Sequence, residues 1–163
     1  MTAVEDKRPW LKSYRLGPYR LAPSLGPYPE EPLYSFLDRS AENYPAQTAV
    51  DFCGLRINYR ELKSYTDSFA RALSSLNVRK GDKVVTVLPT CPQYIIANFA
   101  ILKCGAVHVP CSILHREREL VFEIGESGAE TVICLQEQLD IIRSIQPKTK
   151  LKNIIITSLA DYL

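Results

Sequence analysis

The sequence predicts an α/β fold, namely a mainly parallel, doubly wound sheet with helices on both faces. Short runs rich in Val, Ile and Leu alternate with segments whose apolar residues recur at helical spacing. Glycine or proline bounds most of the runs, as expected for short buried strands. Parallel strands need helical crossovers, which are almost always right-handed. The predicted strands are residues 83–88, 106–110, 131–135 and 153–157.

Length and composition set the class of protein. The 163 residues are 46% hydrophobic, which suffices for one domain with a buried core. The net charge of +2 lacks the basic excess of a nucleic-acid-binding surface. No run approaches the roughly 20 apolar residues of a membrane span. We expect a cytoplasmic chain with no nucleic-acid partner, no transmembrane segment and reduced thiols at Cys53, Cys91, Cys104, Cys111 and Cys134.

Proline divides the chain into two expected parts, residues 1–32 and 33–163. Six of the eleven prolines fall in the first part, which leaves little room for a helix or a paired strand. We therefore predict an extended Pro-rich N-terminal arm over residues 1–32. Its apolar side chains indicate that it lies across a folded surface, namely Trp10, Leu11, Leu16, Leu21 and Leu25.

The second part opens with a helix, a hairpin and a second helix. Apolar residues from Leu33 to Tyr44 have helical spacing, and Pro45 ends the run. Residues 48–58 form two short strands that turn at Cys53 and Gly54. Next, Asn58 and Glu61 fit a capping box. The helix that starts there carries an apolar stripe and stops near Asn77; the stripe is Leu62, Tyr65, Phe69, Leu73 and Leu76.

The remaining helices connect the predicted strands. Thr90 and Gln93 resemble a second capping signature, which opens a helix that closes at Gly105. Further helices are predicted over residues 116–126, stopped by Ser127 and Gly128, and over residues 137–145.

The loops at the carboxyl ends of the strands, where open parallel sheets bind ligands, carry few reactive groups. Neither glycine-rich phosphate motif occurs. The closest glycine pair, Gly125 and Gly128, is better explained as a helix-ending turn. The cysteines Cys91, Cys104 and Cys111 are candidate nucleophiles with His108 or His115 as base, although buried structural thiols are the favoured interpretation.

The histidines and charged residues likewise give no clear catalytic group. We interpret His108, inside a strand, as a hydrogen-bonded structural residue and His115 as a loop residue. The run from Arg116 to Glu119 is most simply a solvated helix start rather than a phosphate clamp. No pairing that would suggest acid–base work is evident for Glu42, Asp82 or Glu123. We therefore assign no catalytic residue and no metal ligand, and the cofactor-binding residues stay unknown.

Six phrases, in this order, resemble the N-terminal subdomain of the adenylate-forming (AMP-binding) superfamily. They are Ile57-Asn58-Tyr59-Arg60-Glu61-Leu62, Val78-Arg79-Lys80-Gly81-Asp82-Lys83-Val84, Leu88-Pro89-Thr90-Cys91-Pro92-Gln93, Lys103-Cys104-Gly105-Ala106-Val107 with Val109-Pro110, Glu119-Leu120, and Ser127-Gly128-Ala129. The entry from Pro27 to Leu37 is most similar to fatty-acid–CoA ligases. One departure is the loop from Cys111 to His115, where the family often has an Asn-Pro pair.

This resemblance implies a two-step reaction in the parent enzyme. A carboxylic acid and ATP give an acyl-adenylate, and coenzyme A then captures the acyl group. The family's phosphate loop would follow residues 153–157, so we expect a truncated piece that is inactive alone. ATP, Mg and coenzyme A are implied for the full-length enzyme, with downstream ATP-binding and C-terminal domains as partners in the same chain. The arm and an exposed interface also make a homodimer an expectation.

Three alternatives stay open. The chain could belong to a ligase for aryl or amino acids instead of fatty acids. It could be a stand-alone, non-catalytic interaction module of the same fold. An unrelated doubly wound domain with a small ligand at its strand ends is the third reading.

Overall fold

The computed structural model describes residues 26–162, and the chain divides into two units, residues 1–31 and 32–163. Most of the predicted Pro-rich arm therefore lies outside the described residues. Every element below belongs to the second unit. In chain order these are α1 (Tyr34–Asn43), β1 (Thr48–Phe52), β2 (Leu55–Asn58), α2 (Tyr59–Ser75), β3 (Lys83–Val87), α3 (Pro92–Lys103), β4 (Val107–Cys111), α4 (Glu117–Ser127), β5 (Thr131–Leu135), η2 (Gln136–Gln138), α5 (Leu139–Ile145), η3 (Gln146–Lys148), β6 (Asn153–Thr157) and η4 (Leu159–Tyr162).

The main sheet has four parallel strands in the order β4-β3-β5-β6, which confirms the predicted fold class. Val85 of β3 lies between Val109 of β4 and Val132 of β5 in the register. The chain moves from β3 to β4 in one direction, then returns past β3 to β5 and β6. This reversal makes the carboxyl ends of β3 and β5 the topological switch point of the sheet.

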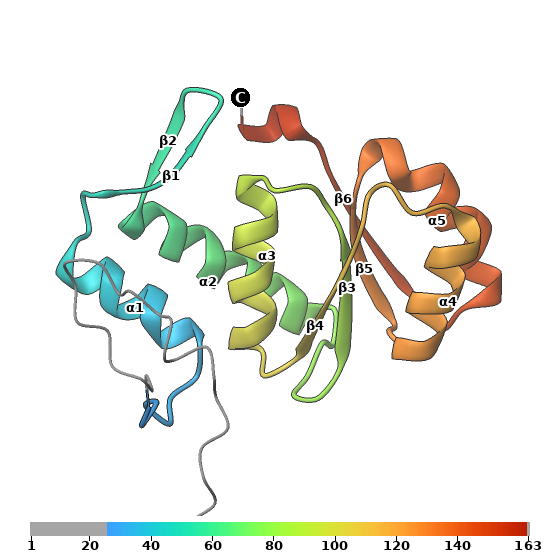
Figure 1. The fold of residues 1–163 in the computed structure, drawn as a ribbon, viewed down its shortest axis with the longest axis horizontal. Helices are drawn as coiled ribbons and strands as arrows, with labels where there is room; N and C mark the ends of the chain where they lie inside the picture. Colours follow the sequence, from blue (N-terminus) through green and yellow to red (C-terminus); the bar gives the residue numbers. More distant parts are fainter. Residues whose placement is uncertain (1–25, 163) are drawn as a thin grey trace, which may run out of the picture. The chain divides into compact units, whose positions relative to one another are not determined.

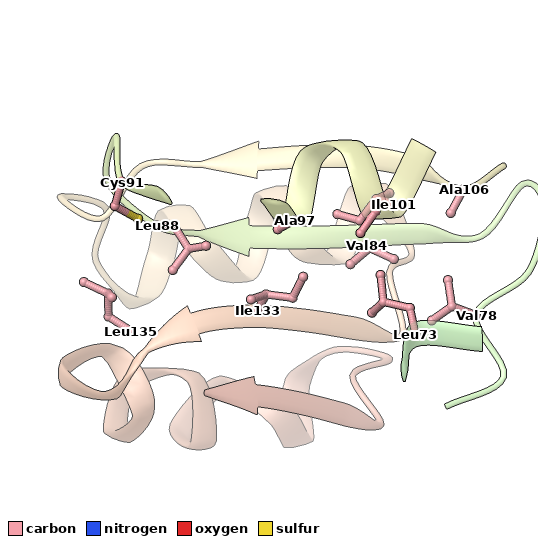
Figure 2. Packing of buried hydrophobic residues seen from close by; sticks show 11 residues of the cluster. Leu73, Val78, Val84, Leu88, Cys91, Ala97, Ile101, Ala106, Ile133 and Leu135 are labelled. Atoms are coloured by element: carbon pink, nitrogen blue, oxygen red, sulfur yellow. The ribbon is translucent and has the colours of Figure 1, made fainter. Parts of the chain in front are cut away.

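Helices cover both faces of this sheet, as predicted (Figure 1). One core cluster packs α2 and α3 against β3 and β5, with Leu73, Val84 and Ile101 fully buried. Figure 2 shows these side chains pointing into the layer between helices and strands. The other cluster packs α4 and α5 on the opposite face around Leu120, Val132 and Ile142. Strands buried on both faces explain their nearly continuous apolar sequences.

The hairpin forms its own two-stranded antiparallel sheet, with Phe52 opposite Leu55. Cys53 has φ 51° and Gly54 has φ 90°, so both central turn residues adopt the left-handed region. A two-residue hairpin loop with that geometry matches the twist of its strands. The predicted turn at these two residues is therefore confirmed.

The capping box of α2 is also confirmed. The Glu61 N–H donates to Asn58 Oδ1 at 2.9 Å, and the Asn58 N–H donates to Glu61 Oε2 at 2.9 Å. Two backbone donors that a helix start leaves open are thus satisfied. Asn77, with φ 68°, terminates the helix region as expected.

Replacing Asn58 with alanine is expected to lower the free energy of unfolding by about 1 kcal/mol, because the variant loses a side-chain cap. Urea denaturation followed by circular dichroism measures the change. Asn43→Ala, at the exposed end of α1, is the matched control and is expected to change stability little. Equal effects of the two substitutions would contradict a specific capping role.

The second capping prediction, on Thr90 and Gln93, is wrong. Cys91 is the N-cap of α3 and has no side-chain cap, and Pro92 is the first helical residue. The ring of Pro92 fixes φ for a helix start and removes one open N–H, so Thr90 is left outside. Gln93 instead donates from Nε2 to the carbonyl of Ser158, 2.7 Å away.

The helix predicted over residues 137–145 is divided in the structure. Residues Gln136–Gln138 form a 3-10 turn, and only Leu139–Ile145 is α-helical. No Ser, Thr, Asp or Asn stands at its start, so the first turn tightens instead of being capped by a side chain.

A cluster of two lysines and two aspartates joins the first three helices. Lys103 Nζ of α3 lies 2.6 Å from Asp38 Oδ1 of α1 and 2.6 Å from Asp67 Oδ1 of α2. Lys63 Nζ lies 2.6 Å from Asp67 Oδ2 and 3.5 Å from Asp38 Oδ1. Burial acts to raise the pKa of Asp67, but hydrogen bonds from Lys103 and Lys63 outweigh it and hold that pKa below its usual value. We call these four residues the lysine–aspartate cluster.

Candidate functional site

The carboxyl edge of the parallel sheet is the first place to look for a site, because of the switch point there. Figure 2 shows Leu88, Cys91 and Leu135 gathered at this edge, where β3 and β5 end. Two hollows open beside it. One lies between the loops after β3 and β4, and the other lies where α2 and α3 meet β6.

The first hollow, of about 390 Å³, is poor in chemistry. Its polar side chains are the hydroxyls of Thr90, Tyr94 and Ser112 and the thiol of Cys111. Its lining holds no histidine, carboxylate, lysine or arginine. The hollow between the β3 and β4 loops therefore offers three hydroxyls and one thiol, and no charged side chain.

The second hollow, of about 570 Å³, is a mostly apolar groove that we call the β6 groove. Its walls include Tyr65 and Phe69 of α2, Ile96 of α3 and Ile155 of β6. Two polar residues at the groove, Gln93 and Asp161, drew no site hypothesis from the sequence. The Asp161 carboxylate accepts hydrogen bonds from the Thr157 hydroxyl at 2.8 Å and the Ser158 N–H at 2.9 Å, and these bonds lower its pKa.

His108 is a hydrogen-bonded residue of the sheet, as its place in a strand predicted. Its Nδ1 lies 2.8 Å from Asn98 Oδ1, and its Nε2 lies 2.8 Å from Thr86 Oγ1. A neutral ring satisfies both, with Nδ1–H donating to Asn98 and Nε2 accepting from the Thr86 hydroxyl. Burial lowers the pKa of His108, which favours this neutral form. Both ring nitrogens are therefore engaged away from any thiol.

Glu123 has a partner that the sequence did not reveal. His115 Nδ1 lies 3.0 Å from Glu123 Oε2, so the absence of pairing that we expected for Glu123 is wrong. The spacing of eight residues, from a loop to the second turn of α4, matches no local pattern. Burial, followed by the nearby Glu123 carboxylate, raises the pKa of Cys111 to about 12.

The buried thiols are poorly suited to nucleophilic attack. Burial raises the pKa of Cys91 and raises that of Cys134 to about 11. Since the thiolate is the nucleophile, a raised pKa suppresses reactivity. Cys104 donates to the Ala70 carbonyl at 3.4 Å. The Glu123 carboxylate near Cys111 adds to the effect of burial, because a nearby negative charge disfavours the thiolate.

Thiol labelling is expected to separate the cysteines. At neutral pH an uncharged maleimide should modify the exposed Cys53 rapidly, while Cys111 and Cys134 react only after unfolding, because they are buried and protonated. Mass spectrometry of the modified peptides, with and without denaturant, measures each rate. Native labelling of Cys111 at the rate of Cys53 would contradict this assignment.

The other candidates are structural. Gly128 ends α4 with φ 65°, and Gly125 lies inside that helix, so the interpretation of this pair as a helix-ending turn is confirmed. Asp82 accepts from the Arg79 N–H at 2.8 Å within a turn. The Arg116 N–H donates to Glu119 Oε2 at 3.1 Å, which makes the charge run a capped helix start. Glu42 is exposed at the end of α1.

The described residues do not fit a metal–nucleotide complex. In the part of the chain that the structure covers, no three His, Cys, Asp or Glu side chains gather as in an all-protein metal site. Mg bound with a nucleotide needs only one or two carboxylates, so the backbone that would hold the phosphates is the deciding feature. Neither hollow presents a run of glycines that would bring several backbone N–H groups to a phosphate. Among residues 26–162, no helix is both long and apolar enough to span a bilayer.

Comparison with known sequences gives a consistent picture. The model of the AMP-binding enzyme family matches residues 37–162. A long-chain-fatty-acid–CoA ligase of Bacillus subtilis is 31% identical over 162 residues, which is 98% of this chain and 28% of that protein. A ligase of the same name from Salmonella typhimurium is 28% identical over 158 residues. The chain thus spans less than a third of the length of these relatives.

Solved structures share the fold. A long-chain-fatty-acid–CoA ligase from Archaeoglobus fulgidus superposes with a TM-score of 0.77 at 24% identity, covering 89% of this chain and 32% of that one. A benzoate CoA ligase from Burkholderia xenovorans gives a TM-score of 0.72 at 21% identity, covering 78% and 26%. With the family model matching most of the sequence, the chain belongs to the AMP-binding enzyme family.

Proposed function

We propose that this chain is the N-terminal part of an ATP-dependent fatty-acid–CoA ligase. The observation that carries the proposal is similarity along almost the whole chain to proteins named long-chain-fatty-acid–CoA ligases. The parent would convert a fatty acid and ATP into an acyl-adenylate and pyrophosphate. Coenzyme A would then take the acyl group and release AMP.

The described residues contribute a scaffold to this reaction. The two-faced sheet and its core fix the relative positions of the helices, and the chain leaves β6 beside the β6 groove. We assign the binding of ATP and Mg to later parts of the parent, because the described residues do not fit a metal–nucleotide complex, and we propose that coenzyme A also binds there. We also propose a cytoplasmic location, which the five free thiols support.

A second candidate is a ligase for another carboxylic acid. The structural relatives include an anthranilate CoA ligase and a benzoate CoA ligase, and a triostin synthetase is 35% identical over 98 residues. The fold alone does not distinguish these acids, since one fold supports many substrates. A stand-alone interaction module is the third candidate.

The test begins with the gene beyond the codon for Leu163. The encoded full-length protein is purified and assayed for AMP and pyrophosphate release with coenzyme A and palmitate, benzoate or an amino acid in turn. We expect turnover with palmitate and none from residues 1–163 alone. Preference for benzoate would favour the aryl-acid ligase, and a stop codon directly after Leu163 would favour the interaction module.

A further inference from the structure

We infer that the β6 groove is the seat of the segment that follows residue 163 in the parent ligase, and that Gln93 positions the chain to enter it. The inference rests on the proposed function, in which the chain continues beyond that residue. The groove, the orientation of Gln93 and the path of the last described residues support it independently.

The groove has the character of an uncovered interior surface. It holds about 570 Å³ between α2, α3 and β6, and its walls are mainly aromatic and aliphatic. Ile155 of β6, the last strand in the sheet order, is only partly buried, whereas Ile133, its register partner on the neighbouring strand β5, is buried. Apolar surface of this kind on one side of a sheet is typical of a face that another segment covers.

Gln93 joins the start of α3 to the chain that leaves β6. Its side chain is 7% exposed, and Nε2 donates to the Ser158 carbonyl across 65 residues of sequence. Because only the amide nitrogen can donate to a carbonyl, Nε2 faces Ser158 and Oε1 points away from it. Oε1 is buried and has no hydrogen-bond partner among residues 26–162. Gln93 therefore brings a buried, unsatisfied acceptor to the wall of the groove, beside the chain that leaves β6.

The last described residues lie at the groove. The short helix η4 (Leu159–Tyr162) follows directly from β6, and both Asp161 and Tyr162 line the groove. The Tyr162 ring packs edge-to-face on Tyr65 of α2, with ring centroids 5.9 Å apart. Because Tyr162 itself lines the groove, the chain that continues after it starts at the groove wall.

The occupant of the groove is therefore the parent's own chain directly after residue 163, not a second copy and not a small ligand. An intramolecular segment that starts at the rim has a high effective concentration there. Its predicted character is apolar, like the aromatic and aliphatic walls of the groove.

Thiol protection tests the inference. Ser68 is exposed and lines the groove, so Ser68→Cys places a reporter there; Ser144→Cys, on exposed α5, is the matched control. Both are made with Cys53→Ser, in the chain of residues 1–163 and in the parent. Maleimide modification is followed by mass spectrometry of the peptide that carries the new cysteine. We expect residue 68 to react at least about tenfold more slowly in the parent, with residue 144 unchanged.

Gln93 is tested in the same parent background. Gln93→Met, which keeps the side-chain length but removes both amide groups, should raise the labelling rate at residue 68 roughly tenfold. Gln136→Met, at an exposed glutamine after β5, should leave that rate unchanged. Equal rates for the two variants would overturn the positioning role.

Two outcomes would overturn the groove assignment, namely equally fast labelling of residue 68 in the parent and in the shorter chain, or protection in the shorter chain that appears only on dimerisation. Acyl-CoA formation by the parent is assayed separately. A protected groove in a parent without that activity would count against the proposed function alone, and an active parent with an open groove would count against this inference alone.

Discussion

Replacing Ile101 with alanine is expected to lower the free energy of unfolding by about 2–5 kcal/mol, the usual range when a buried aliphatic side chain is truncated. Ile101 is fully buried in α3 and belongs to the cluster that packs α2 and α3 on β3 and β5. Close-packed neighbours there collapse only partly into the space that is left. Urea denaturation of the isolated chain, followed by far-UV circular dichroism, measures the loss.

Ile156→Ala is the matched control, because it removes the same atoms from a side chain that is 44% exposed on β6. Its expected cost is below about 1 kcal/mol, since less apolar surface leaves the core. A larger loss at residue 156 than at residue 101 would show that the described core is not the one that stabilises the chain.

Replacing Lys103 with methionine has the second-largest expected effect, a loss of about 1–3 kcal/mol. The side chain of Lys103 is only 14% exposed, and its ammonium is shared by Asp38 and Asp67. Without the ammonium of Lys103, the carboxylates of Asp38 and Asp67 lie close together with only Lys63 to balance their negative charge. Lys63→Met, at a more exposed lysine of the same cluster, is the control and should cost less. Equal losses for the two variants would contradict a central role for Lys103.

The cost of Lys103→Met should also depend on pH. The pKa of Asp67 is depressed in the folded chain, so its ionised form stabilises the fold above the unfolded pKa. That contribution disappears as the pH falls through the folded pKa. Denaturation midpoints of wild type and Lys103→Met should therefore converge in acid. A gap that stays constant between neutral and acid pH would mean that lost packing of the lysine stem, not charge, causes the destabilisation.

The features of the fold that depend on residues close together in the sequence could be predicted. Asn58 and Glu61 stand three residues apart, and a capping box needs nothing else. Likewise, the apolar runs at β3 and β5 identified strands covered on both faces, because exposure on one face would have required alternating polar residues. Thr90 shows the limit of such patterns, since Pro92 outweighs it at the helix start.

Contacts across long stretches of sequence escaped prediction for a physical reason. Asp38, Asp67 and Lys103 meet only because three helices pack together, and no spacing in the chain encodes that meeting. The pair of His115 and Glu123 likewise depends on how a loop folds back on α4. The bond from Gln93 to Ser158 links the start of α3 to the end of β6, so it requires the completed sheet.

The strand order β4-β3-β5-β6 also determines how the sheet can assemble during synthesis. Within the four-stranded sheet, β3 is made first and lies at an inner position. Each later strand of this sheet therefore adds to an existing edge, and none has to be inserted between two strands. The two borders then differ. Pro110 lacks an N–H and weakens β4 as a template, whereas Asn-Ile-Ile-Ile-Thr in β6 contains neither proline nor charge. A nascent chain that pauses after β6 therefore exposes one edge strand that can pair with another strand. That edge strand is β6, from which the growing chain extends.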